Sequence, residues 1–420
     1  MSTTAVVAAA VVPRLAVLAH ERGAILSSFV EKSDTFARTF VASGTFGFVP
    51  GVPSAYTQPL YGFFLIPLYA VDRTWTLVGG AQIVVAAATA CTVLAIGRRH
   101  VGPVGGLVAA LLATLHPYVV WHDVHVNREI LDQLLAAALF GLVLLAAERG
   151  ALAPAAAAGA VAGVAILGNS RLALLPLVLA AFLAARRRAR ALPLAGVLVA
   201  CCIVVLAPWV IRNRVDVGCF ALTTDAHALW KANNVSTYRT LQQGKWIDDV
   251  PPLPGAPRLT PEYETPIYQQ TGRKVHVNEC AQMRLYEHAT IRFWEHHPTE
   301  KLKLMAQASR MLWQPKPTKT SGGNGAATGA LKVWPETIWM CALYVLAAVG
   351  IFLVPRAFAA LALIFLLYNT FAAWVFAGAT RYRIAFDFVL ALLAGAAIER
   401  LLSRSRYTAS VAATVASGEN

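Results

Sequence analysis

The chain has 420 residues, of which 57% are hydrophobic and only 14% are charged, and its mean hydropathy is +0.56. A soluble protein carries about a quarter of its residues charged, so this composition excludes an ordinary soluble enzyme. The formal net charge is +14, but the basic residues gather at the ends of apolar runs, which indicates membrane topology and excludes nucleic acid as a partner.

The apolar runs predict an all-α polytopic membrane protein. Their lengths of about 17 to 25 residues suit transmembrane helices, and they lack the alternation of barrel strands. Arg14 lies inside the first run, and the short apolar segment 59–70, interrupted by Pro67, is predicted to be re-entrant or interfacial. Either feature changes the span count by one. We predict about ten spans, at 3–20, 75–96, 103–120, 130–147, 151–167, 172–185, 192–210, 334–354, 359–377 and 384–402.

The distribution of arginines predicts the orientation of these spans. Basic clusters are enriched on the cytoplasmic side of membrane proteins. With a cytoplasmic N-terminus, all the arginine clusters fall inside, and the polar loops fall outside. We therefore expect a multi-pass protein of the plasma or inner membrane whose functional residues lie on the extracytoplasmic side. The clusters are at 98–99, 149, 186–190, 356 and 400–406.

Three parts follow from this topology. Residues 1–211 form an N-terminal transmembrane module with a first extracytoplasmic loop at 20–72. Residues 212–332 form a long extracytoplasmic loop, and residues 333–420 form a C-terminal transmembrane module with a cytoplasmic tail. Apolar residues recur at near-helical spacing between Cys280 and Trp313, and Pro298 divides this stretch into two amphipathic helices on the membrane surface. A glycine-rich flexible linker is predicted at 322–330.

The six cysteines have no spacing that is typical of a metal site. Cys219 and Cys280 are the pair that falls in the outer loop, where disulfides persist. We predict that these two are bonded to each other. The alternative is two buried free thiols, which the spacing does not exclude.

The unusual polar residues of the chain converge on the outer side of the membrane. Arginine and histidine side chains bind phosphate by charge-assisted hydrogen bonds, and a carboxylate can take a proton from an acceptor hydroxyl. Singly, each residue has a structural alternative as a span-end charge or as an acid favoured by a helix dipole. The residues are Asp34, Asp123, His125, Arg128, Glu129, Arg171, Arg381 and Arg383.

Several stretches in their order along the chain resemble the GT-C glycosyltransferases, especially bacterial relatives of the protein O-mannosyltransferases and lipid A aminoarabinose transferases. This resemblance implies a GT-C-like fold, a polyprenyl-phosphate-linked sugar as donor and an active site on the extracytoplasmic side. The stretches are SDTFARTFVASGTFGF, PSAYTQPLYGFFL, HPYVVWHDVHVNREI, LGNSRLALLP, APWVIRNR, LWKANN and TRYRIAFDFVLALLAG.

The resemblance also implies roles for single residues. Asp34 becomes the candidate catalytic base, Glu129 an acid that orients the substrate, and Arg171 and Arg381 the residues that face the lipid phosphate. The other residues expected to bind substrate are Tyr61, His125, Arg128, Asn233 and Arg383.

The chain departs from the family pattern at one point. Many family members carry a second acid beside the first-loop aspartate, whereas the nearest acids here are Glu31 and Asp72. We therefore predict no metal ligands, and a divalent metal remains an open possibility.

These features together favour an inverting transferase of a hexosyl or pentosyl group, similar to a mannosyltransferase. The acceptor hydroxyl would belong to a glycan, a lipid or a protein at the membrane surface. One alternative is a transporter or flippase of lipid-linked sugars, for which charges buried in mid-span are typical. Another is an inactive assembly factor of the same fold.

Overall fold

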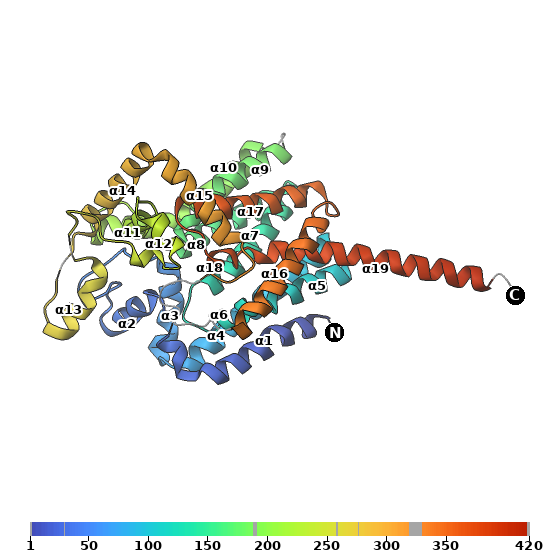
Figure 1. Ribbon diagram of the computed structural model, residues 1–420, viewed down its shortest axis with the longest axis horizontal. Helices are drawn as coiled ribbons and strands as arrows, with labels where there is room; N and C mark the ends of the chain where they lie inside the picture. The colour runs from blue at the N-terminus through green and yellow to red at the C-terminus, as the bar shows by residue number, and fades with distance from the viewer. Residues whose placement is uncertain are drawn as a thin grey trace.

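The computed structural model describes residues 2–28, 30–187, 191–257, 259–275, 277–318 and 330–417. Over these residues the chain is almost entirely helical, and an isolated bridge between Val49 and Val52 is the one β-pairing. The helices pack into an elongated bundle with a group of smaller helices at one end, and the last helix runs out past the opposite end (Figure 1). The predicted all-α membrane architecture is confirmed.

Six helices in the described part of the chain are long and apolar enough to cross a bilayer. The other four predicted spans coincide with α5, α8, α9 and α19, so the number ten stays a prediction. The six are α1 (Ser2–Glu21), α4 (Trp75–His100), α7 (Glu129–Arg149), α10 (Ala191–Asp216), α16 (Ala330–Gly350) and α17 (Arg356–Val375). The remaining bundle helices are α3 (Pro59–Val71), α5 (Pro103–Thr114), α6 (Pro117–His122), α8 (Leu152–Gly168), α9 (Leu175–Arg186), α18 (Thr380–Arg383) and α19 (Asp387–Ser417).

Prolines divide the bundle differently from the predicted spans at two places. The span predicted at 103–120 is wrong as a single helix, because Pro117 starts the new helix α6 after a break at His116. Proline lacks the amide hydrogen of a helix interior and is favoured at the first helical position. The interruption predicted at Pro67 is also wrong, because α3 continues through that residue.

Small residues let the bundle helices approach each other closely, as is usual in membranes. At the contact between α5 and α19, a Cβ added to Gly105 would lie 2.6 Å from the carbonyl oxygen of Gly395. Larger side chains fill the centre, where Phe140 packs edge-to-face against Phe358, Phe365 and Phe388 with ring centroids 5.2, 5.2 and 5.8 Å away. This core fixes α7 and α17, whose ends carry the functional residues described below.

The smaller helices gather at the end of the bundle away from the projecting part of α19 (Figure 1), and the contact of Glu31 with Arg128 joins this end to the start of α7. Pro298 separates α14 from α15 as predicted, and the predicted disulfide between Cys219 and Cys280 is confirmed. Residues 322–329 of the predicted linker lie outside the described residues. These helices are α2 (Ser33–Ser43), α11 (Ala226–Lys231), α12 (Thr237–Gln242), α13 (Glu264–Thr271), α14 (Glu279–His296) and α15 (Pro298–Trp313).

Candidate active site

A buried carboxylate marks the point where three segments meet at this end of the bundle. Glu129 is the first residue of α7 and is 1% exposed. Its Oε1 lies 3.1 Å from Nε of Arg381 on α18, and its Oε2 lies 3.8 Å from Nε2 of His122 at the end of α6. Neither oxygen accepts a hydrogen bond of good geometry from any described residue. Glu129 is thus held by charge and not by a filled hydrogen-bonding shell.

Glu31 joins Glu129 from the loop that precedes α2. Its Oε2 accepts a hydrogen bond of 3.1 Å from the backbone amide of Arg128, and its Oε1 lies 3.8 Å from Nε of the same residue. Burial raises the pKa of the Glu31 carboxyl, while the charge of Arg128 acts in the opposite direction. A half-buried carboxyl with a raised pKa is a good candidate for proton transfer near neutral pH.

Arg128 connects this acid pair to a third carboxylate. Its Nη1 donates 2.9 Å to Oε1 of Gln58, and its Nε lies 3.8 Å from Oδ2 of Asp132. Asp132 also accepts a 2.9 Å hydrogen bond from Nδ2 of Asn169, in the turn after α8. We call the six residues Glu31, His122, Arg128, Glu129, Asp132 and Arg381 the Glu129 cluster.

Arg171 lies beside this cluster and differs from its other cations. Its Nη2 donates a hydrogen bond of 2.6 Å to the carbonyl oxygen of Ala377. Its guanidinium carbon lies 4.0 Å from the ring centroid of Tyr382 and 5.4 Å from that of Phe376. It forms no ion pair with a carboxylate of the described chain. Burial lowers the pKa of Arg171 to about 10. A desolvated cation without a counter-ion is suited to receive an anionic group.

The other guanidinium on the ring of Tyr382 belongs to Arg381, at 5.0 Å from the centroid. The predicted pair Arg171 and Arg381 is therefore brought together through one tyrosine. Of the two, Arg381 is already paired with Glu129.

Asp34 is placed apart from the Glu129 cluster by its own contacts. It lies in the first turn of α2 and is 3% exposed. Its Oδ1 accepts from the hydroxyl of Tyr69 at 2.5 Å and from Nε of Arg73 at 3.0 Å, and its Oδ2 lies 3.0 Å from Nε of Arg38. Both oxygens of Asp34 thus contact partners outside the Glu129 cluster. The catalytic role of Asp34 stays a prediction.

Two further predicted substrate-binding residues make close contacts within the protein. The hydroxyl of Tyr61 donates 2.5 Å to Oε1 of Gln82, and Nδ1 of His125 lies 2.9 Å from the carbonyl oxygen of Trp121. Gln82 in turn donates to the carbonyl oxygens of Asp123 and His125. These contacts fix the loop between α6 and α7. The loop ends at Arg128, directly before Glu129 at the start of α7.

Asn233, also predicted to bind substrate, connects the smaller helices α14 and α15 to the end of α17. Its Nδ2 donates 2.8 Å to the carbonyl oxygen of Val375, and its Oδ1 accepts from Nε1 of Trp294 at 2.9 Å and from Nζ of Lys301 at 2.5 Å. Burial lowers the pKa of Lys301 to about 8. The sequence pattern shows Lys301 only as a polar residue of an amphipathic helix, so its contact with Asn233 was not predicted.

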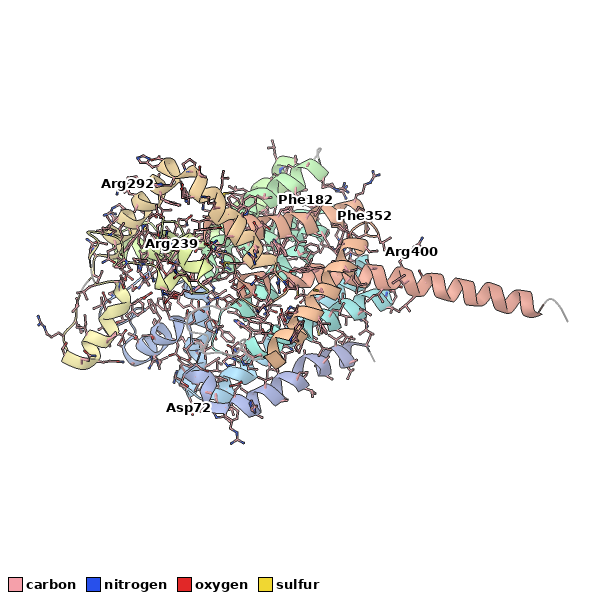
Figure 2. All side chains as sticks on the ribbon, viewed as in Figure 1. Asp72, Phe182, Arg239, Arg292, Phe352 and Arg400 are labelled. Atoms are coloured by element: carbon pink, nitrogen blue, oxygen red, sulfur yellow. A yellow bond between two sulfur atoms is a disulfide. The ribbon has the colours of Figure 1, made fainter. Side chains whose placement is uncertain are left out.

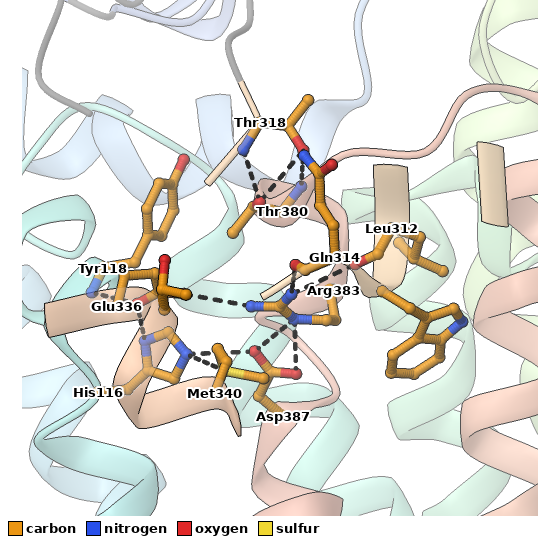
Figure 3. Close-up of polar contacts among 12 residues, drawn as sticks. His116, Tyr118, Leu312, Gln314, Thr318, Glu336, Met340, Thr380, Arg383 and Asp387 are labelled. Carbon is orange, nitrogen blue, oxygen red and sulfur yellow. Dashed lines mark hydrogen bonds and ion pairs between the residues drawn. The ribbon is translucent and has the colours of Figure 1, made fainter. Parts of the chain in front are cut away.

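Arg383, two residues after Arg381, points into a separate set of buried partners (Figure 3). It is 0% exposed, and its three guanidinium nitrogens donate to Asp387, Glu336, Tyr344 and two backbone carbonyls at 3.0–3.3 Å. The ring of His116 lies 3.4 Å from both carboxylates. We call Arg383, Glu336, Asp387, His116 and Tyr344 the Arg383 network. The substrate-binding role predicted for Arg383 stays a prediction.

Arg14, the charge inside the first span, also has its partner within the bundle. Its Nη2 lies 2.7 Å from Oδ2 of Asp123, whose Oδ1 accepts 2.9 Å from Gln133. Sequence patterns do not reveal this pair, since its members are far apart in the chain. No group of three or more His, Cys, Asp or Glu residues within the described ranges is arranged to hold a metal ion.

Comparison with known families and structures places these features in context. A family model described as dolichyl-phosphate-mannose-protein mannosyltransferase matches residues 58–211. This region carries Glu129, Arg128, Asp132 and Arg171. No curated protein sequence matches the chain significantly.

Among solved structures, the archaeal oligosaccharyltransferase AglB from Archaeoglobus fulgidus, in complex with an inhibitory peptide and a dolichol-phosphate, has a similar fold. The TM-score is 0.54 at 13% identity, over 97% of this chain and 51% of that chain. The chain thus spans about half the length of AglB. ArnT from Cupriavidus metallidurans bound to undecaprenyl phosphate matches at a TM-score of 0.43 and 16% identity, over 94% of this chain and 77% of that chain.

The likeness to AglB establishes a shared fold. With the match of the family model, it confirms the predicted resemblance to the GT-C glycosyltransferases.

Proposed function

We propose that the chain is a membrane glycosyltransferase that moves a sugar from a polyprenyl-phosphate donor to an acceptor hydroxyl on the extracytoplasmic side. The observation that carries this proposal is the Glu129 cluster with Arg171 beside it. The buried acid Glu129, the half-buried acid Glu31 and a cation without a carboxylate partner in the described chain lie at one end of an apolar bundle. The family match and the GT-C-like fold support the same reaction class.

In the proposed reaction, Glu31 accepts the proton of the acceptor hydroxyl as its oxygen attacks the anomeric carbon. The new bond forms from the acceptor oxygen to that carbon, and the bond from carbon to the phosphate oxygen breaks. The lipid phosphate leaves with the electron pair, and Arg171 meets its charge. Attack on the face opposite to the leaving phosphate inverts the anomeric centre. Glu129, held by Arg381, orients the hydroxyls of the sugar or acceptor.

Asp34 is the alternative base, as the resemblance implies. Glu31 lies in the Glu129 cluster and burial raises its pKa, whereas Asp34 contacts Tyr69, Arg73 and Arg38 outside the cluster, which makes Glu31 our preferred assignment. Substitution of each acid by its amide separates the two, because only loss of the base removes most of the rate.

A lipid-linked sugar transporter is the second candidate function, and the buried pair of Arg14 and Asp123 is the observation that favours it. Charges inside the membrane commonly mark transport pathways. This pair is fully enclosed and hydrogen-bonded, which suits a structural contact equally well. The two functions differ in product: a transferase makes a new glycoside, whereas a flippase only moves its substrate between leaflets.

The proposal is tested in two steps. Mass spectrometry of extracytoplasmic glycoconjugates, in cells with the chain and in cells with Glu129→Gln in its place, identifies the product. Purified protein in liposomes is then given the corresponding polyprenyl-phosphate sugar. We expect a glycoside that the parent makes and the variant does not. Transfer by the variant at the parent's rate, or translocation of the donor without a product, would contradict the proposal.

The proposed orientation has an independent test at the disulfide. After reduction, a membrane-impermeant thiol reagent applied to intact cells should label Cys219 and Cys280, which lie among the outer helices. Cys91 and Cys341 should stay unlabelled. Labelling of Cys219 and Cys280 only from the cytoplasmic side would contradict the proposed extracytoplasmic position of the Glu129 cluster.

A further inference from the structure

A cavity lies at the end of the bundle opposite to the Glu129 cluster. It has a volume of about 290 Å³ and is formed by the last residues of α4, α7 and α9 together with the first residues of α17. Glu129 begins α7 and Glu148 lies near its other end, so the helix separates the two sites by about 28 Å at 1.5 Å per residue. This distance is close to the thickness of the hydrocarbon core of a bilayer.

The walls of the cavity combine apolar and basic side chains. Leu144 and Phe358 are buried on its apolar side. The basic residues His100, Arg186 and Arg187 line its polar side, together with the acidic residue Glu148. The amino end of α17 opens into the same space.

The charges at this cavity are not balanced. Glu148 is already engaged, since its Oε2 lies 2.7 Å from Nη2 of Arg99 and its Oε1 lies 3.2 Å from Nδ1 of His100. Arg187 donates 2.7 Å to the carbonyl oxygen of Ala147 and so caps the end of α7. Arg186 is exposed and forms no ion pair with any carboxylate in the described part of the chain. One cation therefore faces the cavity without a counter-ion.

We propose that this cavity binds the phosphate headgroup of an anionic phospholipid from the cytoplasmic leaflet. The positive-inside distribution of arginines places this end on the cytoplasmic side, where anionic lipids are found and where basic pockets between helix ends receive their headgroups. The adjoining turn exposes Phe352 by 85% and Leu353 by 43%, which gives the acyl chains an apolar surface. Figure 2 shows Phe352 at this end together with Arg400. The inference does not depend on the proposed transfer reaction.

The test measures lipid binding to the purified, delipidated full chain by native mass spectrometry. Phosphatidylglycerol and phosphatidylcholine with identical acyl chains are titrated separately, and glycerol phosphate is added as a soluble competitor. The variants are Arg186→Glu, Arg186→Gln, and Arg400→Glu, which makes the same charge change on the same end but does not line the cavity. Melting temperatures confirm that the exposed substitutions leave the fold intact.

We expect the parent to prefer phosphatidylglycerol, and Arg186→Glu to weaken this binding by roughly tenfold or more, since a charge-assisted contact becomes a repulsion. Arg186→Gln should give a smaller loss, and Arg400→Glu should change the affinity by less than about threefold. Equal losses for Arg186→Glu and Arg400→Glu would mean diffuse attraction to the basic surface and would overturn the site. Equal affinity for the two lipids, or displacement by glycerol phosphate at lipid concentrations, would overturn it as well.

Discussion

Arg381 and Arg383 are two residues apart on the short helix α18, yet they have opposite surroundings. Arg383 is 0% exposed, and all three of its guanidinium nitrogens donate hydrogen bonds, to two carboxylates, a tyrosine and two backbone carbonyls (Figure 3). Arg381 pairs with Glu129 at 3.1 Å and lies over the ring of Tyr382, and its side chain is 19% exposed. Arg383 is fully enclosed by its own partners, whereas Arg381 lies at the partly exposed edge of the Glu129 cluster.

The difference follows from the cost of burying charge. A buried ion pair is tolerated when its remaining donors and acceptors are satisfied, and a partly satisfied one is normally avoided. Partly satisfied charges persist mainly at functional sites, where the substrate supplies the missing partners. We infer that the Arg383 network holds α18 in place, so that Arg381 stays over Glu129.

The largest expected effect separates the two acids of the outer loop. Glu31→Gln should lower the rate of transfer by roughly 100-fold to 10,000-fold, the range for loss of a general base. Asp34→Asn should cost less than tenfold at equal expression, since the amide keeps its contact with Tyr69. Single-turnover kinetics in liposomes measure both. The reverse order of effects would return the catalytic role to Asp34.

The next prediction concerns stability and contrasts the two arginines directly. Arg383→Met should lower the free energy of unfolding by about 3–5 kcal/mol, because Glu336 and Asp387 stay buried without their cation. Arg381→Met should lower it by less, because Glu129 keeps the charge of Arg128 nearby and Arg381 itself is partly exposed. Denaturant unfolding in detergent, followed by tryptophan fluorescence, provides the measurement. Equal losses of unfolding free energy for the two variants would show that Arg383 is no more important for stability than Arg381.

Sequence patterns predicted much of this architecture, because they report local properties. Apolar runs and prolines gave most helices and the boundary between α14 and α15, and the outer position of Cys219 and Cys280 predicted their disulfide. The break at Pro117 and the continuation of α3 through Pro67 were missed, since a proline at a helix start and one inside a helix look alike in the sequence.

The partners of the polar residues were beyond prediction, because they depend on tertiary contacts. Arg381 and Arg383 belong to one motif, and only the geometry of α18 assigns them to different carboxylates. Glu31 and Asp34 are three residues apart in the sequence, yet the former contacts Arg128 and the latter contacts Arg73. The sequence therefore predicted that the outer end is functional, but not which acid faces the cluster.

A smaller effect is expected at Arg171, which lies on the same tyrosine ring as Arg381. Arg171→Ala should raise the KM for the polyprenyl-phosphate donor by roughly tenfold to hundredfold, which is the loss of one charge-assisted contact of about 1.5–3 kcal/mol. The KM for the acceptor should stay the same. Arg171→Lys should restore part of the affinity, because it keeps the charge but not the planar fork. A change confined to the acceptor KM would show that Arg171 does not bind the lipid phosphate.

The smallest expected effect is a shift of the activity profile along the pH axis. Glu31 must be deprotonated to act as a base, so kcat/KM should fall as the pH falls through its pKa, which burial raises above the ordinary value for Glu. Arg128 opposes that rise by its charge, and Arg128→Gln should therefore move the acidic limb of the profile to higher pH. Arg38→Gln, which removes a comparable charge next to Asp34 instead, should leave the limb in place. A limb that moves with Arg38→Gln and not with Arg128→Gln would identify Asp34 as the titrating base, and the Glu129 cluster would then serve only to bind.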